Sequence, residues 1–93
     1  MDAQETLAKF LSGIEKDPRI RITHIAVYTV LFQQWAACGC AKSMGIVSSE
    51  IMEKSKISST ATYHRAIRAL HEYGYIRYYP SYNNKRKSQV SLQ

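Results

Sequence analysis

Two groups of basic residues in the C-terminal third of the chain have the chemistry to bind a polyanion. Arg65 and Arg68 stand three positions apart after a run of Ser, Thr and Ala, and Lys85, Arg86 and Lys87 are consecutive. Guanidinium groups bind phosphates and the edges of guanine bases, whereas an ammonium group binds phosphate as a point charge. These residue types at this spacing indicate a partner such as nucleic acid.

The overall composition agrees with a polyanionic partner. The 93 residues include 13 Lys and Arg against 7 Asp and Glu, which gives a formal net charge of +6. Glu72 is the only acidic residue after Ser58, and all but one of the seven tyrosines also follow that position. A basic segment rich in aromatic residues favours nucleic acid. The same composition also suits a solvated basic surface with half-buried tyrosines, so the order of residues must distinguish the two.

Helical spacing dominates the first half of the chain. Residues 3–14 carry apolar side chains at i, i+3, i+4 and i+7, which predicts an amphipathic helix. These side chains are Leu7, Phe10, Leu11 and Ile14. We expect Thr23 to cap a second helix, which would be the main core helix. Its apolar residues are Ile25, Tyr28, Leu31, Phe32 and Trp35. Glycines and small residues then predict a loop over residues 37–47.

A short and a long helix are predicted on either side of a tight turn. Ser48 or Ser49 is expected to cap a helix over residues 50–54, and residues 55–57 form the turn. Ser58 or Ser59 is expected to cap the longer helix, which ends at Gly74. Because each residue advances about 100° around the axis, this helix has two faces. The apolar face is formed by Tyr63, Ala66, Ile67, Leu70 and Tyr73. The opposite face is formed by Ala61, Arg65, Arg68 and Glu72.

Beyond the long helix the period of the pattern changes to two. Residues 75–79 and 89–92 alternate, which predicts a β-hairpin. One face of the first strand would carry Ile76 and Tyr78, and the other would carry Tyr75, Arg77 and Tyr79. We favour packing of these tyrosines within the strands over stacking on unpaired bases. The connection over residues 80–88 places the basic run after Asn83-Asn84, which predicts a cationic hairpin tip.

This order of elements is that of a winged helix-turn-helix, and the sequence resembles that family. Residues 47–76 resemble the general pattern, in which a leucine lies four residues before a glycine and an apolar strand follows, here Leu70, Gly74, Tyr75 and Ile76. Shorter motifs are similar to those of small winged-helix proteins of bacterial conjugative and other mobile elements. They are Asp17-Pro18-Arg19-Ile20, Thr23-His24-Ile25, Tyr63-His64, Leu70-His71-Glu72-Tyr73-Gly74-Tyr75-Ile76 and Pro80-Ser81-Tyr82-Asn83. The chain departs from the family at Lys87-Ser88, where such hairpins often have a glycine.

The resemblance implies a mainly α protein with a small β-hairpin, in the α+β class. We expect an N-terminal helix over residues 1–16, which packs on the domain or joins two copies in a homodimer, and a winged helix-turn-helix domain over residues 17–93. Such relatives are regarded as transcriptional regulators, so the implied function is sequence-specific binding of double-stranded DNA. The alternative is an accessory DNA-binding or protein-interaction module in replication, recombination or excision of a mobile element.

In the expected mechanism the helix over residues 58–73 enters the major groove, and the hairpin over residues 80–90 lies on the backbone or in the minor groove. Arg65 is the expected reader of a base. The predicted DNA-binding residues are Ser48, Ser49, Ser58, Ser59, Thr60, Thr62, His64, Arg65, Arg68, Asn84, Lys85, Arg86 and Lys87. Each group also has a purely structural interpretation. The arginines could pair with Glu72, the serines could act only as helix caps, and the basic tip could be a soluble turn.

The sequence carries no motif of an enzyme, a cofactor site or a metal site. It contains no GxxxxGK, HExxH or GxSxG, so we predict no catalytic residue, no cofactor and no small-molecule ligand. A tyrosine nucleophile for DNA strand transfer would need a catalytic cleft that 93 residues leave little space to build. We interpret Cys38 and Cys40 as reduced thiols. The alternative is a zinc site that His24, His64 or His71 would complete.

No segment of the sequence has the pattern of a membrane span or a secretory signal. The longest nearly uncharged stretch, residues 22–41, is interrupted by threonine, histidine and glutamine residues. A span needs about 20 predominantly apolar residues, and the first residues lack the basic and apolar regions of a signal peptide. We therefore expect a cytoplasmic location, associated with the nucleoid.

Overall fold

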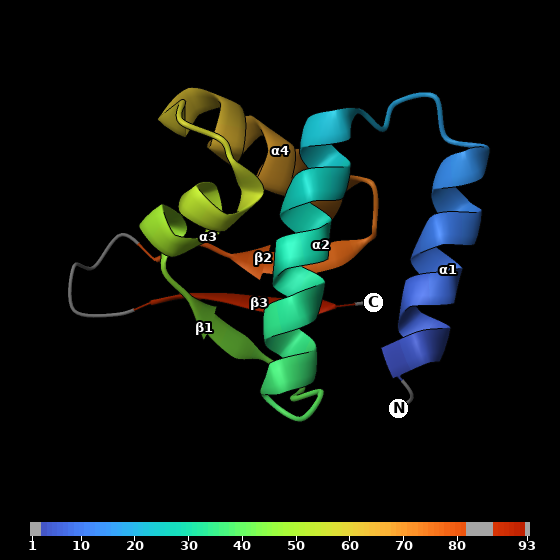
Figure 1. The fold of residues 1–93 in the computed structure, drawn as a ribbon, viewed down its shortest axis with the longest axis horizontal. Coiled ribbons are helices and arrows are strands. Elements are labelled where there is room, and N and C mark those ends of the chain that lie inside the picture. Colours follow the sequence, from blue (N-terminus) through green and yellow to red (C-terminus); the bar gives the residue numbers. More distant parts are fainter. Residues whose placement is uncertain (1–2, 82–86, 93) are drawn as a thin grey trace.

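The computed structural model describes residues 3–81 and 87–92, and this part of the chain contains four helices and a small antiparallel sheet (Figure 1). The helices are α1 (Ala3–Glu15), α2 (Ile22–Ala37), α3 (Ser48–Ser55) and α4 (Thr60–Glu72). The strands are β1 (Met44–Ile46), β2 (Ile76–Tyr79) and β3 (Ser88–Leu92), in the order β1-β3-β2 across the sheet. The predicted mainly helical α+β class is confirmed.

Helix α1 lies beside α2 and contributes one aromatic ring to the core (Figure 1). Phe10 stacks on Tyr28 with 3.6 Å between ring centroids, and the edge of Tyr75 approaches Phe10 at 5.3 Å. Leu7 and Ile14 are half-buried against the same cluster, whereas Leu11 is 47% exposed. Of the predicted apolar residues of α1, Phe10 is therefore buried, Leu7 and Ile14 are partly buried, and Leu11 is exposed.

Helix α2 supplies the largest share of the core, but it begins earlier than predicted. Its first residue is Ile22 and its N-cap is Arg21, so the prediction that Thr23 caps the helix is wrong. The physical reason is a local hydrogen bond, in which the backbone N–H of Arg21 donates to Nδ1 of His24 at 2.8 Å. Burial lowers the pKa of His24, and the nearby Arg21 charge lowers it further. The ring is therefore held neutral, as an acceptor must be.

Strand β1 lies within the segment that was predicted to be a loop, so this prediction is wrong for residues 44–46. Met44 pairs with Val90 and Ile46 pairs with Ser88 of β3. Both Met44 and Ile46 are buried, which a pattern of only three residues could not indicate. The side-chain amide of Gln34 also donates to the carbonyl of Gly45 at 3.0 Å. Strand β1 therefore connects the hairpin to helix α2.

Helices α3 and α4 are joined by a short turn at the position expected. Lys56 has a left-handed backbone with φ 63°, which reverses the chain after α3. Helix α3 begins at Ser48 with Val47 as its N-cap, so neither Ser48 nor Ser49 caps it. Ser59 caps α4 as predicted and accepts a hydrogen bond from the N–H of Thr62 at 3.2 Å. Gly74 follows the end of α4 with φ +86°, the conformation that favours glycine after a helix.

We expect the Ser59→Ala substitution to destabilise the protein by about 1 kcal/mol, because the first turn of α4 loses a side-chain acceptor. Urea denaturation without DNA measures the effect. Ser58→Ala is the matched control, since Ser58 is the exposed neighbour and does not cap the helix. Equal destabilisation by the two substitutions would contradict the assigned cap.

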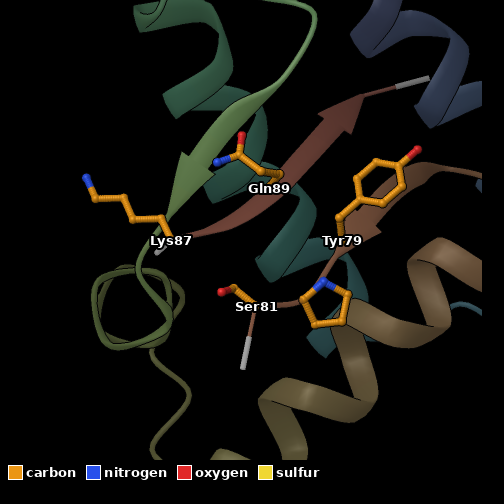
Figure 2. Close-up of a pocket in the computed structure, with 5 residues that line it drawn as sticks. Tyr79, Ser81, Lys87 and Gln89 are labelled. Atoms are coloured by element: carbon orange, nitrogen blue, oxygen red, sulfur yellow. The ribbon is translucent and has the colours of Figure 1, made fainter. Parts of the chain in front are cut away.

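The predicted hairpin is confirmed, and the predicted alternation holds over residues 76–79. Tyr75, predicted on the exposed face with Arg77 and Tyr79, precedes β2 and is half-buried against Phe10, so that part of the prediction is wrong. Ile76 and Tyr78 are buried, whereas Arg77 and Tyr79 are exposed. Tyr79 pairs with Gln89 across the sheet, and Figure 2 shows both side chains on the open face of the two strands. The hydroxyl of Ser88 accepts a hydrogen bond from the N–H of Ser81 at 3.1 Å. This bond joins the two strands at the base of the hairpin.

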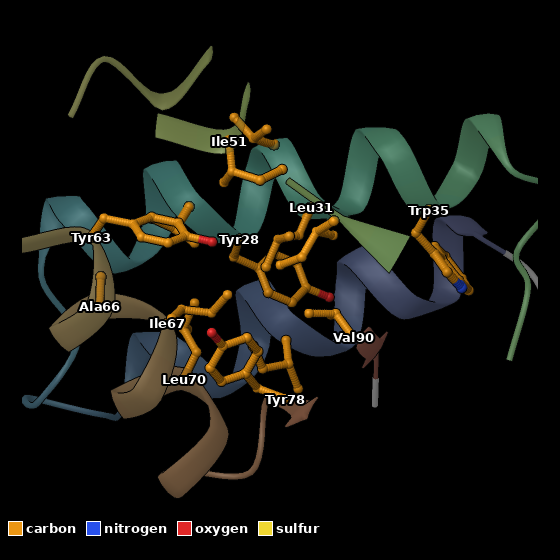
Figure 3. Packing of buried hydrophobic residues seen from close by; sticks show 14 of the residues in the cluster. Tyr28, Leu31, Trp35, Ile51, Tyr63, Ala66, Ile67, Leu70, Tyr78 and Val90 are labelled. Carbon is orange, nitrogen blue, oxygen red and sulfur yellow. The ribbon is translucent and has the colours of Figure 1, made fainter. Parts of the chain in front are cut away.

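The core lies between α2, α4 and one face of the sheet (Figure 3). Leu31, Ile67 and Leu70 are fully buried there. The hydroxyl groups of Tyr28 and Tyr63 are also buried, without a hydrogen-bond partner among the described residues. Burial raises the pKa of Tyr28 to about 12 and also raises the pKa of Tyr63. Both side chains therefore serve as neutral packing groups.

A polar contact fixes the connection between α1 and α2 against the start of the hairpin. The Asp17 carboxylate accepts hydrogen bonds from Nε and Nη2 of Arg19 at 2.8 and 2.9 Å, and from the Tyr75 hydroxyl at 2.7 Å. The Arg19 guanidinium also lies over the Tyr73 ring, 4.0 Å from its centroid. The bonds from Arg19 and Tyr75 hold the pKa of Asp17 well below its usual range.

We expect the Asp17→Asn substitution to destabilise the protein most at neutral pH and progressively less as the pH falls below about 4. A carboxyl group with a lowered pKa in the folded state stabilises the fold above its ordinary pKa of 3.8, and this contribution is lost as the pH falls below that value. The gap in unfolding free energy between wild type and variant should be constant from pH 7 to about pH 5 and narrow below about pH 4. Urea titrations of wild type and variant at each pH measure this gap. A gap that is independent of pH would refute the assignment, and Glu15→Gln serves as the exposed carboxylate control.

Candidate nucleic-acid interface

The two faces of α4 separate as the sequence predicts. Tyr63, Ala66, Ile67 and Leu70 are buried against the core, while Arg65 and Arg68 are exposed on the other side. Tyr73, expected on the buried face, is half-buried because it lies at the C-cap under Arg19. Packing of the apolar face therefore fixes which side of α4 is presented to a partner.

The exposed arginines of α4 are not neutralised by a neighbouring acid. Among residues 3–81 and 87–92, the single ion pair joins Asp17 and Arg19. The alternative interpretation, in which Arg65 or Arg68 pairs with Glu72, is therefore wrong for this structure. Both guanidinium groups keep their full set of donors for a partner.

A hydrogen bond to His71 connects the end of α4 with strand β2. The Nδ1 atom of this residue accepts a hydrogen bond from the N–H of Tyr78 at 3.0 Å. The residue lies one turn beyond Arg68 and connects the end of α4 to β2. Sequence reasoning considered His71 only as a zinc ligand, because its role depends on where β2 passes.

The polar residues that are predicted to bind DNA beside the arginines differ in their solvent exposure. Ser58, Ser59 and Thr60 are exposed at the start of α4, although the Ser59 hydroxyl already serves as the cap. Thr62 and His64 are half-buried, and the His64 ring lies 5.2 Å from the Tyr63 ring. Ser48 and Ser49 are exposed in the first turn of α3, at the end of that helix away from the turn into α4. Of the predicted polar residues on α4, those at its start are therefore the exposed ones.

The hairpin contributes one described basic residue of the predicted set. Lys87 is exposed at the start of the returning strand. The other predicted tip residues, Asn84, Lys85 and Arg86, lie outside the described residues. Arg77, Tyr79 and Gln89 are exposed on the hairpin but are not among the predicted site residues, although the period of two places Arg77 and Tyr79 on the face opposite Ile76 and Tyr78.

The structure does not assemble the alternative zinc site. Cys38 and Cys40 are free thiols at the end of α2, and the part of the chain that the structure describes contains no cluster of three or more potential ligands. Every helix in this part of the chain is too short or too polar to cross a bilayer. Comparisons with protein-family models, with curated proteins and with solved structures found no match.

Proposed function

We propose that the chain is a winged helix-turn-helix protein that binds double-stranded DNA in a sequence-specific manner and regulates transcription. The observation that carries the proposal is the exposed face of α4, where Arg65 and Arg68 have no acidic partner among the described residues. The order of elements supports it, because a short helix, a turn and a longer helix are followed by a hairpin. Pairing of β1 with β3 supports it further, since this holds the hairpin on the same body as α4.

In the proposed complex, α4 lies in the major groove. Its 13 residues make a rod of about 20 Å, and its exposed face presents the guanidinium donors of Arg65 and Arg68. Arg65, in the middle of the helix, donates two hydrogen bonds to a guanine. Arg68, one turn later, binds a phosphate, and Lys87 binds the backbone beside the hairpin. A homodimer on a symmetric site and a nucleoid-associated cytoplasmic location belong to this proposal.

Selection from a random duplex pool at about 0.15 M salt tests the proposal, because weak electrostatic binding is screened there within about 8 Å. A regulator should enrich one motif and bind it roughly 10³- to 10⁷-fold more tightly than random DNA. A motif with two related half-sites would report a homodimer. Binding at low salt without an enriched motif would replace the regulator with the accessory module. Failure to bind DNA at any salt would refute both.

A further inference from the structure

The sheet has an open face of which the proposed complex of α4 with duplex DNA uses only Lys87. A shallow depression of about 530 Å³ lies on this face at the base of the hairpin. It is lined by Tyr79, Pro80, Ser81, Lys87 and Gln89. Figure 2 shows the Gln89 amide between the side chains of Lys87 and Tyr79 in this view. The depression therefore combines an aromatic ring, an amide and a cation.

Tyr79 is the aromatic group of this face. Its side chain is 53% exposed, although the neighbouring Tyr78 is buried in the core. The pairing of Tyr79 with Gln89 brings the aromatic ring next to an amide on the adjacent strand. Arg77 is exposed on the same side of β2, because side chains two residues apart share a face. A ring in this position is available for stacking.

The sheet holds Lys87 and Gln89 in place on the open face. Gly45 on β1 has no side chain, and the aliphatic part of Lys87 lies over it. A Cβ atom at Gly45 would be only 3.1 Å from Cδ of Lys87. The same atom would lie 3.5 Å from Nε2 of Gln89. The hydroxyl of Ser43 donates to Oε1 of Gln89 at 3.0 Å, which orients the amide and leaves its N–H groups free to donate.

We propose that this open sheet face, which we call the Tyr79 face, binds an unpaired nucleotide of single-stranded nucleic acid. A base stacks on the Tyr79 ring, the Gln89 amide donates to a carbonyl oxygen of that base, and Lys87 with Arg77 binds the flanking phosphates. The described residues of the face include cations but no acid, which suits a polyanion rather than a basic or neutral protein segment. Duplex DNA does not fit, because its bases are already stacked on one another.

The proposal goes beyond binding of duplex DNA by α4 and does not depend on it. Lys87 is assigned to both surfaces, so the test uses Tyr79, which belongs to the Tyr79 face alone. Tyr79→Ala removes the ring and Tyr79→Phe keeps it. Because Tyr79 is exposed, we expect both variants to unfold at the wild-type temperature.

Fluorescence anisotropy with labelled strands of twelve thymidines and twelve uridines tests the proposal and separates DNA from RNA. Base stacking predicts that Tyr79→Ala binds the preferred strand roughly 5- to 150-fold more weakly than wild type. Tyr79→Phe should stay within about twofold of wild type, since the phenyl ring stacks equally well. Leu11→Ala is the matched control, as another exposed apolar side chain far along the chain from the sheet.

Two results would overturn the proposal. In the first, the wild-type protein binds neither strand. In the second, Tyr79→Ala binds both strands with the affinity of the wild-type protein. A blunt duplex is titrated in parallel. If the duplex binds and neither strand does, the Tyr79 face is refuted, while the duplex binding that the proposed function requires is unaffected. If a strand binds through Tyr79 and no duplex binds, the proposed function fails and the Tyr79 face stands.

Discussion

Replacing Phe10 by alanine is expected to lower the free energy of unfolding by about 3–5 kcal/mol, as for other buried phenylalanines. Phe10 is 4% exposed and stacks on Tyr28, which is itself fully inside the core. The substitution leaves a cavity between α1 and α2 and removes the edge contact with Tyr75. A loss of this size is a large part of the roughly 5–15 kcal/mol that holds a small domain together. Urea denaturation followed by Trp35 fluorescence measures it.

Leu11→Ala provides the control on the same helix, because Leu11 is adjacent in sequence but 47% exposed. We expect it to cost less than about 1 kcal/mol. If Phe10→Ala were equally mild, α1 would not belong to the core and would be free to join two copies of the chain. Dependence of the unfolding midpoint on protein concentration would then be expected, as for a homodimer.

The helices and the hairpin could be predicted from sequence because their signals are local. In α4 the spacing of Ile67 and Leu70 marks the buried side, and Ser59 and Gly74 mark the ends. The orientation of Arg65 follows from the same spacing, since a helix that buries one side must expose the other. The exposed face of α4 could therefore be predicted without knowledge of the tertiary structure.

Strand β1 and the cap of α2 could not be predicted because they depend on distant or unusual partners. Met44–Ile46 is three residues long and contains a glycine, and its strand conformation comes from pairing with residues 88–90. The N-cap of α2 is an arginine, and the bond that fixes it is made by the side chain of His24. Neither residue type signals a helix start by itself.

The Tyr79 face was missed for the same reason. The alternation of β2 places Tyr79 on the face opposite the core, and packing within the strands is the predicted role of these tyrosines. Tyr78 is buried as that prediction requires, whereas Tyr79 is 53% exposed. The placement of Lys87 beside Gln89 depends on Gly45 in β1, the strand that the sequence did not reveal. A surface made by three strands could not be recognised while one of them was missing.

Replacing Arg65 by alanine is expected to weaken binding to the selected duplex by roughly 5- to 150-fold, which corresponds to about 1–3 kcal/mol for a bidentate contact with guanine. Arg65 is exposed on α4 and has no acidic partner among the described residues. The variant should lose the preference for guanine at the contacted base pair. Its affinity for random DNA should change little, because random DNA does not make the bidentate contact. Titration of the selected duplex, of the duplex changed at that base pair and of random DNA measures the loss.

Arg68→Gln should behave differently, because a phosphate contact carries no sequence information. It should weaken the selected and the random duplex alike and reduce the slope of log affinity against log salt by about 0.9. Lys9→Gln, which removes one exposed charge from α1, is the charge-matched control and should leave the ratio of the two affinities unchanged. If Arg65→Ala also weakened both duplexes equally, Arg65 would be a second phosphate contact. Together with a selection that enriches no motif, this result would favour the accessory module, because α4 would then hold DNA without reading it.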